Sequence, residues 1–296
     1  MSVFKSNLLL LIAAAIWGLA FVAQRVGMDY VGPFTFNGVR FFLGSLSLVQ
    51  LIFYFRRDAQ SSRREFKNAV VPGIIAGSVL FGGVSLQQVG LVYTTAGKAA
   101  FITGLYVVLV PLISILLGRK IGTSSLLGSV LAASGLYLLC IKEALTINFG
   151  DMLQFMGAFF WAVHILLIGY FSRRIDALKL SCLQYLVCSV LSMAVAVVAE
   201  TIVWADILAA YIVIIYGGVF STGIAYTLQV VAQKYAPPAN AAIILSMETV
   251  FAAVGGYLIL GERMSGTEIM GCALMLSGML TAQIGSLRRE ANQVQL

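Results

Sequence analysis

One glutamate stands apart from the other acidic residues because apolar sequence surrounds it on both sides. Glu248 lies in the middle of the hydrophobic run 237–260, whereas all five aspartates fall at the ends of such runs. An ionisable group at the centre of a bilayer costs about 2.5–3.5 kcal/mol on insertion scales, so it should face a cavity or a partner. Glu248 could bind an amino group or another cation, or take up a proton. The alternative is a structural carboxylate that joins helices through hydrogen bonds.

Aromatic residues at a similar depth could form other parts of a binding site. Trp17, Trp161 and Tyr106 lie near the middle of hydrophobic runs, although tryptophan and tyrosine usually favour the membrane interface. In the wall of a cavity, such rings could stack on a solute or bind a cation through the π face. Packing between helices is the alternative for each ring. Tyr226 is a further candidate for the wall.

The single histidine and two glutamines are weaker candidates for the site. His164 follows Trp161 by one helical turn, so both lie on one face of a helix. Its imidazole could relay a proton near neutral pH, but a neutral, hydrogen-bonded core histidine is the more common case. Gln87 and Gln229 lie toward the ends of their runs. Polar contact between helices is favoured for them over contact with a solute.

Two basic residues lie inside hydrophobic runs, one or two helical turns from one end. As an outer gate, Arg40 and Lys98 would attract anionic groups. The alternatives are that they extend to the lipid headgroups or pair with Asp29. Lys98 also begins a half-span that ends at Pro111, where the missing backbone donor permits a kink.

The sequence lacks motifs for catalysis and for metal or nucleotide binding. A zinc site of the HExxH type needs two histidines, and the chain has one. It has neither a pair of aspartates within a span nor a GxxxxGK(S/T) loop for phosphates. The four cysteines lie in apolar runs and form no CxxC pair. We expect no enzyme, no cofactor and no metal site, so any energy coupling would use a proton, an ion or an exchange gradient.

The elements that would position these residues are transmembrane helices. Of the 296 residues, 60% are hydrophobic and 10% are charged, whereas soluble domains carry about 25% charged residues. A transmembrane helix needs about 20 mainly apolar residues. Ten such runs follow one another through short connections: 7–27, 33–55, 70–92, 95–117, 122–141, 151–172, 178–200, 207–233, 237–260 and 265–286.

The distribution of basic residues predicts the orientation of these spans. With a cytoplasmic N-terminus, 14 lysines and arginines fall on the inner side and three on the outer side, and two within spans complete the 19. This bias places both termini in the cytoplasm. It also accounts for the net charge of +7 as a feature of a protein in a lipid bilayer, with no need for a nucleic-acid partner.

The two halves of the chain, 1–145 and 146–296, resemble each other at an offset of 142 to 144 residues. Each half holds five runs, an odd number, so the second half would enter the membrane from the opposite side. Inverted repeats of this kind form secondary transporters, in which two bundles rock about a central site. The alternative is a duplicated scaffold without transport. The corresponding residues include Trp17 and Trp161, Gln87 and Gln229, and Tyr106 and Glu248.

Five short motifs lie along the chain: Ala15-Ile16-Trp17-Gly18, Gly38-Val39-Arg40-Phe41, Thr95–Thr103 with Pro111, Met247-Glu248-Thr249-Val250-Phe251 and Leu260-Gly261-Glu262-Arg263. Together they resemble the motifs of EamA-like transporters in the drug/metabolite transporter superfamily, and the resemblance covers essentially the whole chain. The resemblance implies ten helices in two inverted five-helix repeats around a central solute cavity, and many relatives export amino acids and other small metabolites. Thr249 departs from the pattern, because the family often has proline after the glutamate.

The sequence therefore predicts an all-α membrane protein with ten transmembrane helices in two inverted five-helix repeats. We expect a secondary-active transporter of the inner (cytoplasmic) membrane that exports a small amino-acid-like, amphipathic or cationic solute by alternating access. Export rests on the resemblance alone. Uptake of a cationic or choline-like nutrient, a non-transporting scaffold and an intramembrane enzyme are the alternatives, and a homodimer is left open. The predicted site comprises Trp17, Tyr106, Trp161, His164, Tyr226 and Glu248, with Arg40 and Lys98 as the gate.

Overall fold

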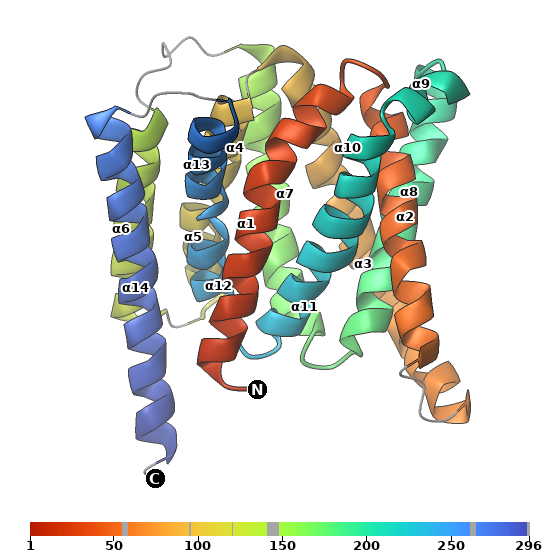
Figure 1. Ribbon diagram of the computed structural model, residues 1–296. Helices are drawn as coiled ribbons and strands as arrows, with labels where there is room; N and C mark the ends of the chain where they lie inside the picture. The colour runs from red at the N-terminus through yellow and green to blue at the C-terminus, as the bar shows by residue number, and fades with distance from the viewer. Residues whose placement is uncertain (55–58, 95, 120, 141–147, 261–264, 295–296) are drawn as a thin grey trace.

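The computed structural model describes residues 1–54, 59–94, 96–119, 121–140, 148–260 and 265–294. These residues form helices, and no β-strand occurs among them (Figure 1). In chain order the helices are α1 (Val3–Gly27), α2 (Pro33–Tyr54), α3 (Ala59–Tyr93), α4 (Ala96–Gly104), α5 (Tyr106–Leu116), α6 (Thr123–Cys140), α7 (Phe149–Phe171), α8 (Ala177–Ala199), α9 (Trp204–Ala209), α10 (Tyr211–Ile215), η1 (Tyr216–Tyr226), α11 (Thr227–Gln233), α12 (Pro238–Leu245), α13 (Glu248–Leu260) and α14 (Gly266–Val294).

The predicted spans correspond to the long apolar helices. Within the described residues, eight helical segments are long and apolar enough to cross a membrane. Two shorter apolar helices, Thr123–Leu138 and Ile269–Ile284, match the fifth and tenth predicted runs. The all-α membrane fold is thus confirmed, and the ten predicted spans agree with these ten segments. The eight longer segments are Val3–Gly27, Pro33–Tyr54, Arg64–Tyr93, Ala96–Leu116, Phe149–Phe171, Ala177–Ala199, Tyr211–Gln233 and Pro238–Gly255.

Two spans are interrupted half-way along their length. The fourth span breaks at Leu105, between α4 and α5, where the Leu105 amide donates to the Ile102 carbonyl at 3.2 Å in a tightened turn. The expectation that the half-span ends at Pro111 is wrong, because Pro111 lies inside α5. The ninth span breaks between α12 and α13, at Ser246 and Met247.

The break in the ninth span forms without the proline that the family often has. The Thr249 hydroxyl donates to the Ser246 carbonyl at 2.7 Å, and the Ser246 hydroxyl donates to the Ile243 carbonyl at 2.8 Å. These hydroxyls bond to carbonyl groups that the interrupted helix leaves without all of their usual partners. Hydroxyl groups therefore stabilise the break locally, and a missing backbone donor is not required.

The eighth span contains a feature that the sequence did not predict. Residues Tyr216–Tyr226 form η1, a π-helix of 11 residues, in a region predicted as part of one apolar run, 207–233. Such helices are rare and occur often at functional sites. The Thr222 hydroxyl donates to the Gly217 carbonyl at 2.8 Å, five residues earlier. The Tyr216 hydroxyl donates to the Ile16 carbonyl of α1 at 2.8 Å, which holds η1 against α1.

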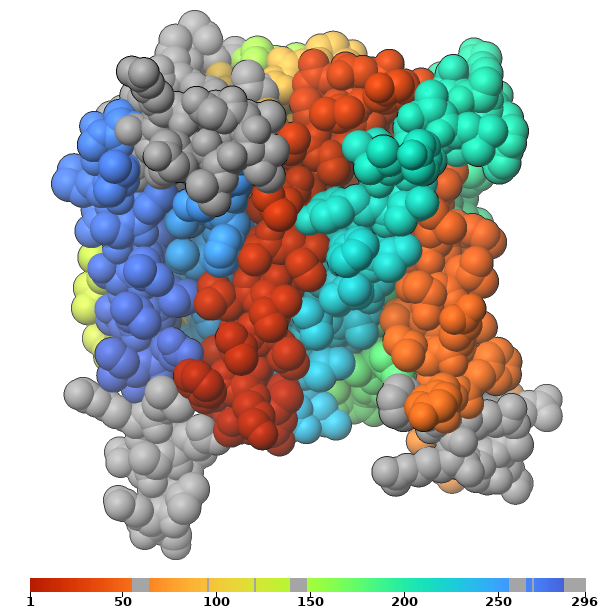
Figure 2. Space-filling model, in the orientation of Figure 1, coloured from red at the N-terminus to blue at the C-terminus, as the bar shows by residue number. Residues whose placement is uncertain are grey.

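The helices pack in pairs that join the two halves of the chain. Helix α2 packs along α8, α3 along α7, and α6 along α14. Helix α1 crosses one face of the molecule between α13 and η1 and contacts both (Figures 1 and 2). Both chain termini lie at the same end of the bundle (Figure 1).

Reciprocal hydrogen bonds connect α2 and α8. The Ser45 hydroxyl donates to the Cys182 carbonyl at 3.1 Å, and the Ser189 hydroxyl donates to the Gly38 carbonyl at 2.8 Å. Ser45 and Ser189 are 144 residues apart in the sequence, and so are Gly38 and Cys182. Exchanging the corresponding residues therefore converts one bond into the other.

Helices α6 and α14 approach each other through glycines. A Cβ atom on Gly128 would lie 2.7 Å from the Gly278 carbonyl oxygen, and one on Gly278 would lie 2.6 Å from the Gly128 carbonyl oxygen. Both positions therefore need a residue without a side chain. Small residues let transmembrane helices pack backbone to backbone, where van der Waals contact supplies much of the association energy in lipid.

Candidate solute-binding site

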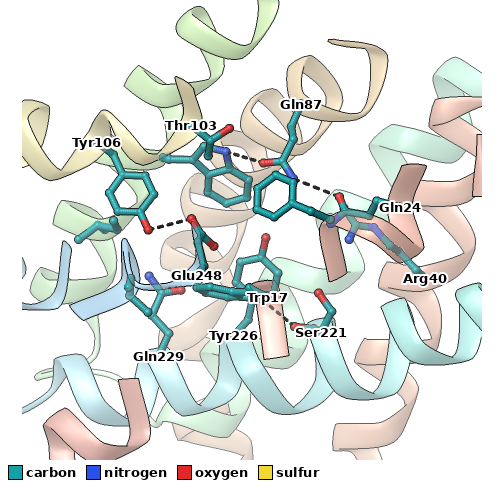
Figure 3. Close-up of a pocket in the computed structure, with 14 residues that line it drawn as sticks. Trp17, Gln24, Arg40, Gln87, Thr103, Tyr106, Ser221, Tyr226, Gln229 and Glu248 are labelled. Carbon is teal, nitrogen blue, oxygen red and sulfur yellow. Dashed lines mark hydrogen bonds between the residues drawn. The ribbon is translucent and has the colours of Figure 1, made fainter. Parts of the chain in front are cut away.

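A cavity lies where the two broken spans meet α1, α2, α3, α7 and η1 (Figure 3). Its free volume is about 40 Å³, enough for a few water molecules. A solute of the size of an amino acid would therefore require side chains or helices to move. The lining residues are Trp17, Phe21, Gln24, Arg40, Gln87, Thr103, Tyr106, Trp161, Ile165, Ser221, Tyr226, Gln229, Leu245 and Glu248.

Glu248 and Tyr106 meet in this cavity. The Tyr106 hydroxyl donates to Glu248 Oε1 at 2.9 Å. Both residues begin the second half of a broken span, Tyr106 in α5 and Glu248 in α13. The helix interruption thus places the carboxylate at a helix N-terminus, where the backbone dipole favours negative charge. Gly18 of α1 allows this arrangement, because a Cβ atom there would lie 2.6 Å from the Glu248 carbonyl oxygen.

Three aromatic rings form one wall of the cavity. The Trp17 and Tyr226 rings lie 4.5 Å apart between centroids, and the Trp161 and Tyr226 rings lie 6.1 Å apart with planes 20° from parallel. The Trp161 indole N–H donates to Gln87 Oε1 at 3.1 Å, and the Trp17 indole N–H donates to the Ser221 carbonyl at 3.1 Å. These bonds fix the two indole rings on either side of Tyr226.

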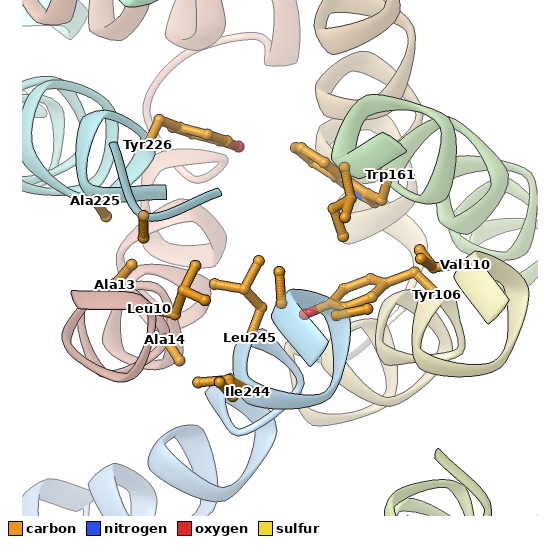
Figure 4. Packing of buried hydrophobic residues seen from close by; sticks show 14 of the residues in the cluster. Leu10, Ala13, Ala14, Tyr106, Val110, Trp161, Ala225, Tyr226, Ile244 and Leu245 are labelled. Carbon is orange, nitrogen blue, oxygen red and sulfur yellow. The ribbon is translucent and has the colours of Figure 1, made fainter. Parts of the chain in front are cut away.

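An apolar cluster packs beside the cavity. Leu10, Ala13 and Ala14 of α1 belong to the same buried cluster as Ile244 and Leu245 of α12 (Figure 4). Leu245 also lines the cavity. All five side chains are at most 1% exposed, so close packing of α1 against α12 occludes this side of the cavity.

Arg40 lies on the cavity wall and is 1% exposed, so the alternative that it extends to the headgroups is wrong. Its Nε atom donates to Asn37 Oδ1 at 2.9 Å, and its Cζ atom lies 4.8 Å from the centre of the Phe41 ring. The alternative of pairing with Asp29 is also wrong, because Asp29 pairs with Arg25 at 3.1 Å. Among the described residues, no carboxylate lies within ion-pair distance of Arg40.

Lys98 lies outside the set of lining residues and has a carboxylate partner. Its Nζ atom is 2.6 Å from Asp151 Oδ2, so the alternative of pairing with Asp29 is wrong here as well. The Thr94 hydroxyl donates to Asp151 Oδ1 at 2.7 Å. The backbone N–H of Asn148 also donates to Asp151 Oδ2, at 2.8 Å, as part of the cap of α7. This cluster joins α4 to the first turn of α7.

His164 lies behind the aromatic wall. It is fully buried and does not line the cavity. Its Nε2 atom is 2.9 Å from Gln184 Oε1, and its ring is edge-on to Trp161 and to Tyr226. It therefore contacts two lining residues and can influence a solute only through them.

Comparison with known proteins identifies the family. The EamA-like transporter family matches residues 4–141 and 148–282. The chain belongs to this family. An uncharacterized transporter of Archaeoglobus fulgidus is 31% identical over 287 residues, which are 94% of this chain and 86% of that one. The uncharacterized transporter YoaV of Bacillus subtilis is 22% identical over 281 residues, 93% of this chain and 95% of that one.

The fold of this EamA-like protein also occurs among solved structures. One crystal structure matches 98% of this chain over 100% of the solved chain, with a TM-score of 0.79 and 19% sequence identity. At this identity the likeness concerns the fold alone. The family and the names of its relatives indicate a transporter and not an enzyme, as predicted.

The structure gathers most of the predicted site of this EamA-like protein. Five of the six predicted binding residues line the cavity, and so does the predicted gate residue Arg40. Gln87 and Gln229, predicted mainly as contacts between helices, line it too. Sequence reasoning missed Gln24, whose position seven residues after Trp17 could have indicated it, since that spacing repeats one helical face. Ser221 contributes a backbone carbonyl, for which its side chain gives no signal.

Proposed function

We propose that this protein is a secondary-active transporter that exports a small zwitterionic metabolite, such as an amino acid or a related amphipathic solute. One observation carries the proposal. Glu248 lies with Tyr106 on one side of the cavity, and Arg40 lies on the other (Figure 3). A zwitterion would bind its amino group at Glu248 and its anionic group at Arg40. Trp17 and Tyr226 would cover the part of the solute between the two charges.

Alternating access is the mechanism that we propose, with residues 1–145 and 146–296 as two inverted repeats. The reciprocal bonds of Ser45 and Ser189 support a two-fold relation between the halves. So do the breaks in the fourth and ninth spans, which fall at corresponding positions. Rocking of two such bundles would open a central site to each side in turn.

The orientation, direction and coupling are further parts of the proposal. Both termini lie at one end of the bundle (Figure 1), and the excess of basic residues in the connections at that end favours the cytoplasm. The inner membrane stays a prediction. Glu248 is the group that would carry a proton in a proton-coupled cycle, and exchange of solutes is the other form of coupling. A homodimer stays a prediction.

Uptake of a choline-like cation is less well supported than transport of a zwitterion. Choline has no anionic group, so Arg40 would remain in the cavity beside a second positive charge. Like charges at short range in a medium of low dielectric repel strongly. The presence of Arg40 thus favours a solute that carries both signs of charge.

Flux into and out of liposomes that contain the purified protein tests the proposal. The panel would hold labelled zwitterionic amino acids, choline and organic anions, each with a proton gradient and in exchange mode. We expect exchange of at least one zwitterion and none of choline. Glu248→Gln should lower this flux by about tenfold or more, since a hydrogen bond to a charged group contributes about 1.5–3 kcal/mol. The matched control is Asp206→Asn, at an exposed carboxylate.

Two results would overturn the proposal. One is the absence of flux for every solute of the panel under all gradients, which favours a scaffold. The other is choline flux that exceeds zwitterion flux, which favours uptake of a cation. A Glu248→Gln variant with normal flux at every pH would assign that carboxylate a structural role.

A further inference from the structure

The two tryptophans of the cavity occupy corresponding positions, but their indole groups have different acceptors. Trp161 donates to Gln87 Oε1 at 3.1 Å. Trp17 is 144 residues before Trp161, and Gln229 is 142 residues after Gln87, so the corresponding bond would join Trp17 to Gln229. Trp17 donates instead to the backbone carbonyl of Ser221, at 3.1 Å. One of the two equivalent bonds is therefore formed and the other is not.

The unused acceptor is present in the cavity. Gln229 lines the cavity and is 2% exposed. Its Oε1 atom is buried and has no hydrogen-bond partner among the described residues. A buried amide oxygen without a partner is unfavourable by about 1–3 kcal/mol relative to a paired one. A conformation in which Trp17 donates to Gln229 would remove this penalty.

A second pair of corresponding contacts shows the same imbalance. Lys98 is bound to Asp151, and the residues at the corresponding positions are Asn240 and Asn7. Asn7 is 2% exposed, and both atoms of its amide lack hydrogen-bond partners among the described residues. Asn240 accepts a hydrogen bond from Ser125 instead, at 2.6 Å. The two contacts of α7 at Trp161 and Asp151 are thus formed, and the two corresponding contacts of α1 are not.

The helix form differs at the same place. The Ser221 carbonyl that holds Trp17 belongs to the π-helix η1. At an offset of 142 residues, η1 corresponds to residues 74–84, which are part of the α-helix α3. The widened helix and the exchanged acceptor therefore occur together in one half of the chain. Because π-helices are rare and usually occur as short bulges within α-helices, this segment is suited to a change of form between two states.

We propose that Gln229 is a positioning residue for transport, which accepts the Trp17 indole N–H in a second conformation of the transport cycle. In that state Trp161 leaves Gln87, so the bonds Trp161–Gln87 and Trp17–Gln229 form alternately. The inference rests on the proposed alternating access. It assigns one conformation to each bond, so removing Gln87 or Gln229 should shift the equilibrium between the conformations in opposite directions.

Fluorine NMR of 5-fluorotryptophan in the full chain can measure these populations without any solute. The chain has three tryptophans, and Trp204, which is 70% exposed, serves as a reference. We expect two states for the Trp17 and Trp161 resonances. Gln87→Leu removes the acceptor of Trp161 and also the bond that Gln87 donates to Gln24 Oε1 at 3.1 Å, so it should shift the population ratio at least about three- to tenfold away from the present state. Gln229→Leu should shift the ratio about three- to tenfold toward the present state, as expected for one neutral hydrogen bond.

Two variants separate positioning from a general structural effect. Gln229→Glu keeps an acceptor for Trp17, so it should retain both states. Gln233→Leu removes a buried amide one turn further along the chain, which bonds to Ile165 and does not line the cavity. It should leave the Trp17 resonance unchanged even if it lowers thermal stability.

The inference is overturned if Gln87→Leu and Gln229→Leu shift the Trp17 population in the same direction, or if neither shifts it. Its failure is distinct from failure of the proposed function, because the spectra need no transported solute. If the protein transports a solute but these variants leave the Trp17 populations unchanged, the role of Gln229 is rejected and the proposed function is not. Opposite shifts without flux would support the two conformations and reject transport of the tested solutes.

Discussion

Two regions of the molecule bring an acidic and a basic side chain into the predicted spans or to their ends, and the partners of these side chains differ. Lys98 and Asp151 neutralise each other at 2.6 Å, with Thr94 as a further donor to the carboxylate. Glu248 and Arg40 face one cavity but bind neutral partners, a tyrosine in one case and an asparagine with aromatic rings in the other. The first arrangement is complete within the protein. The second leaves both ionisable groups without a partner of opposite charge among the described residues, so that each can bind a solute.

This difference indicates what each pair contributes. A buried ion pair that loses one member leaves an uncompensated charge, which is strongly destabilising. A charge that the fold does not neutralise is costly in the folded protein, so its removal need not lower stability. The comparison therefore predicts opposite outcomes for the two regions: loss of stability for one and loss of transport for the other.

Removal of Lys98 should have the largest effect on stability. In Lys98→Met, the Asp151 carboxylate loses its cation, and we expect the free energy of unfolding to fall by about 3 kcal/mol, at the low end for a broken buried pair. Thr94 and Asn148 still donate to the carboxylate, which limits the loss. Denaturant unfolding in detergent measures this change.

A second substitution tests whether the effect belongs to the pair. Lys98→Met combined with Asp151→Asn removes both charges and should recover part of the lost stability, because coupled residues are not additive. A single Lys98→Met variant as stable as the wild type would contradict the comparison. So would a double variant whose loss is the sum of the two single losses.

Removal of the Arg40 charge should impair transport and leave the stability of the protein nearly unchanged. We expect Arg40→Met to lower zwitterion flux by about tenfold, which corresponds to about 1.4 kcal/mol, while thermal stability stays close to that of the wild type. The control is Arg25→Met, at a half-exposed residue of α1 that pairs with Asp29 in the turn after this helix. If Arg40→Met unfolds as readily as Lys98→Met and transports normally, the two regions have the same role.

The sequence was sufficient to predict the membrane spans, because a bilayer imposes a length and a composition on every helix that crosses it. It was also sufficient to predict that Glu248 faces a partner or a cavity, since a carboxylate in an apolar run needs one of the two. The internal repeat added Tyr106, which the structure brings to 2.9 Å from Glu248. These inferences depend on local composition or on matched positions, and both can be read along a single chain.

Other features depend on packing between distant segments. Lys98 and Asp151 are 53 residues apart, and no local pattern joins them. Arg40 is seven residues after Pro33, the first residue of α2, which suggested a place near the surface, but the cavity extends to that depth. The π-helix lies within one predicted apolar run together with α-helices, so hydropathy does not distinguish it. Its hydrogen-bond register follows from tertiary contacts such as that between Tyr216 and Ile16.

The break in the ninth span offers the smallest and most local test. Thr249 stands where the family often has proline, and its hydroxyl donates to the Ser246 carbonyl at 2.7 Å. In Thr249→Val this bond is lost, and we expect the free energy of unfolding to fall by about 1 kcal/mol. Flux should fall only slightly, because Glu248 still begins α13 and Gly18 still leaves room for its backbone.

Thr249→Ser separates the hydroxyl from the methyl group at this position. The Thr249→Ser variant keeps the hydroxyl donor and should unfold at nearly the same denaturant concentration as the wild type. The Thr249→Val variant should unfold at a lower concentration. If both variants lower stability equally, packing of the methyl group determines the effect. If Thr249→Val instead abolishes flux at unchanged stability, the break itself takes part in solute binding. The Thr249 hydroxyl then belongs with Glu248 and Arg40 to the region that serves transport, and not to the region that serves stability.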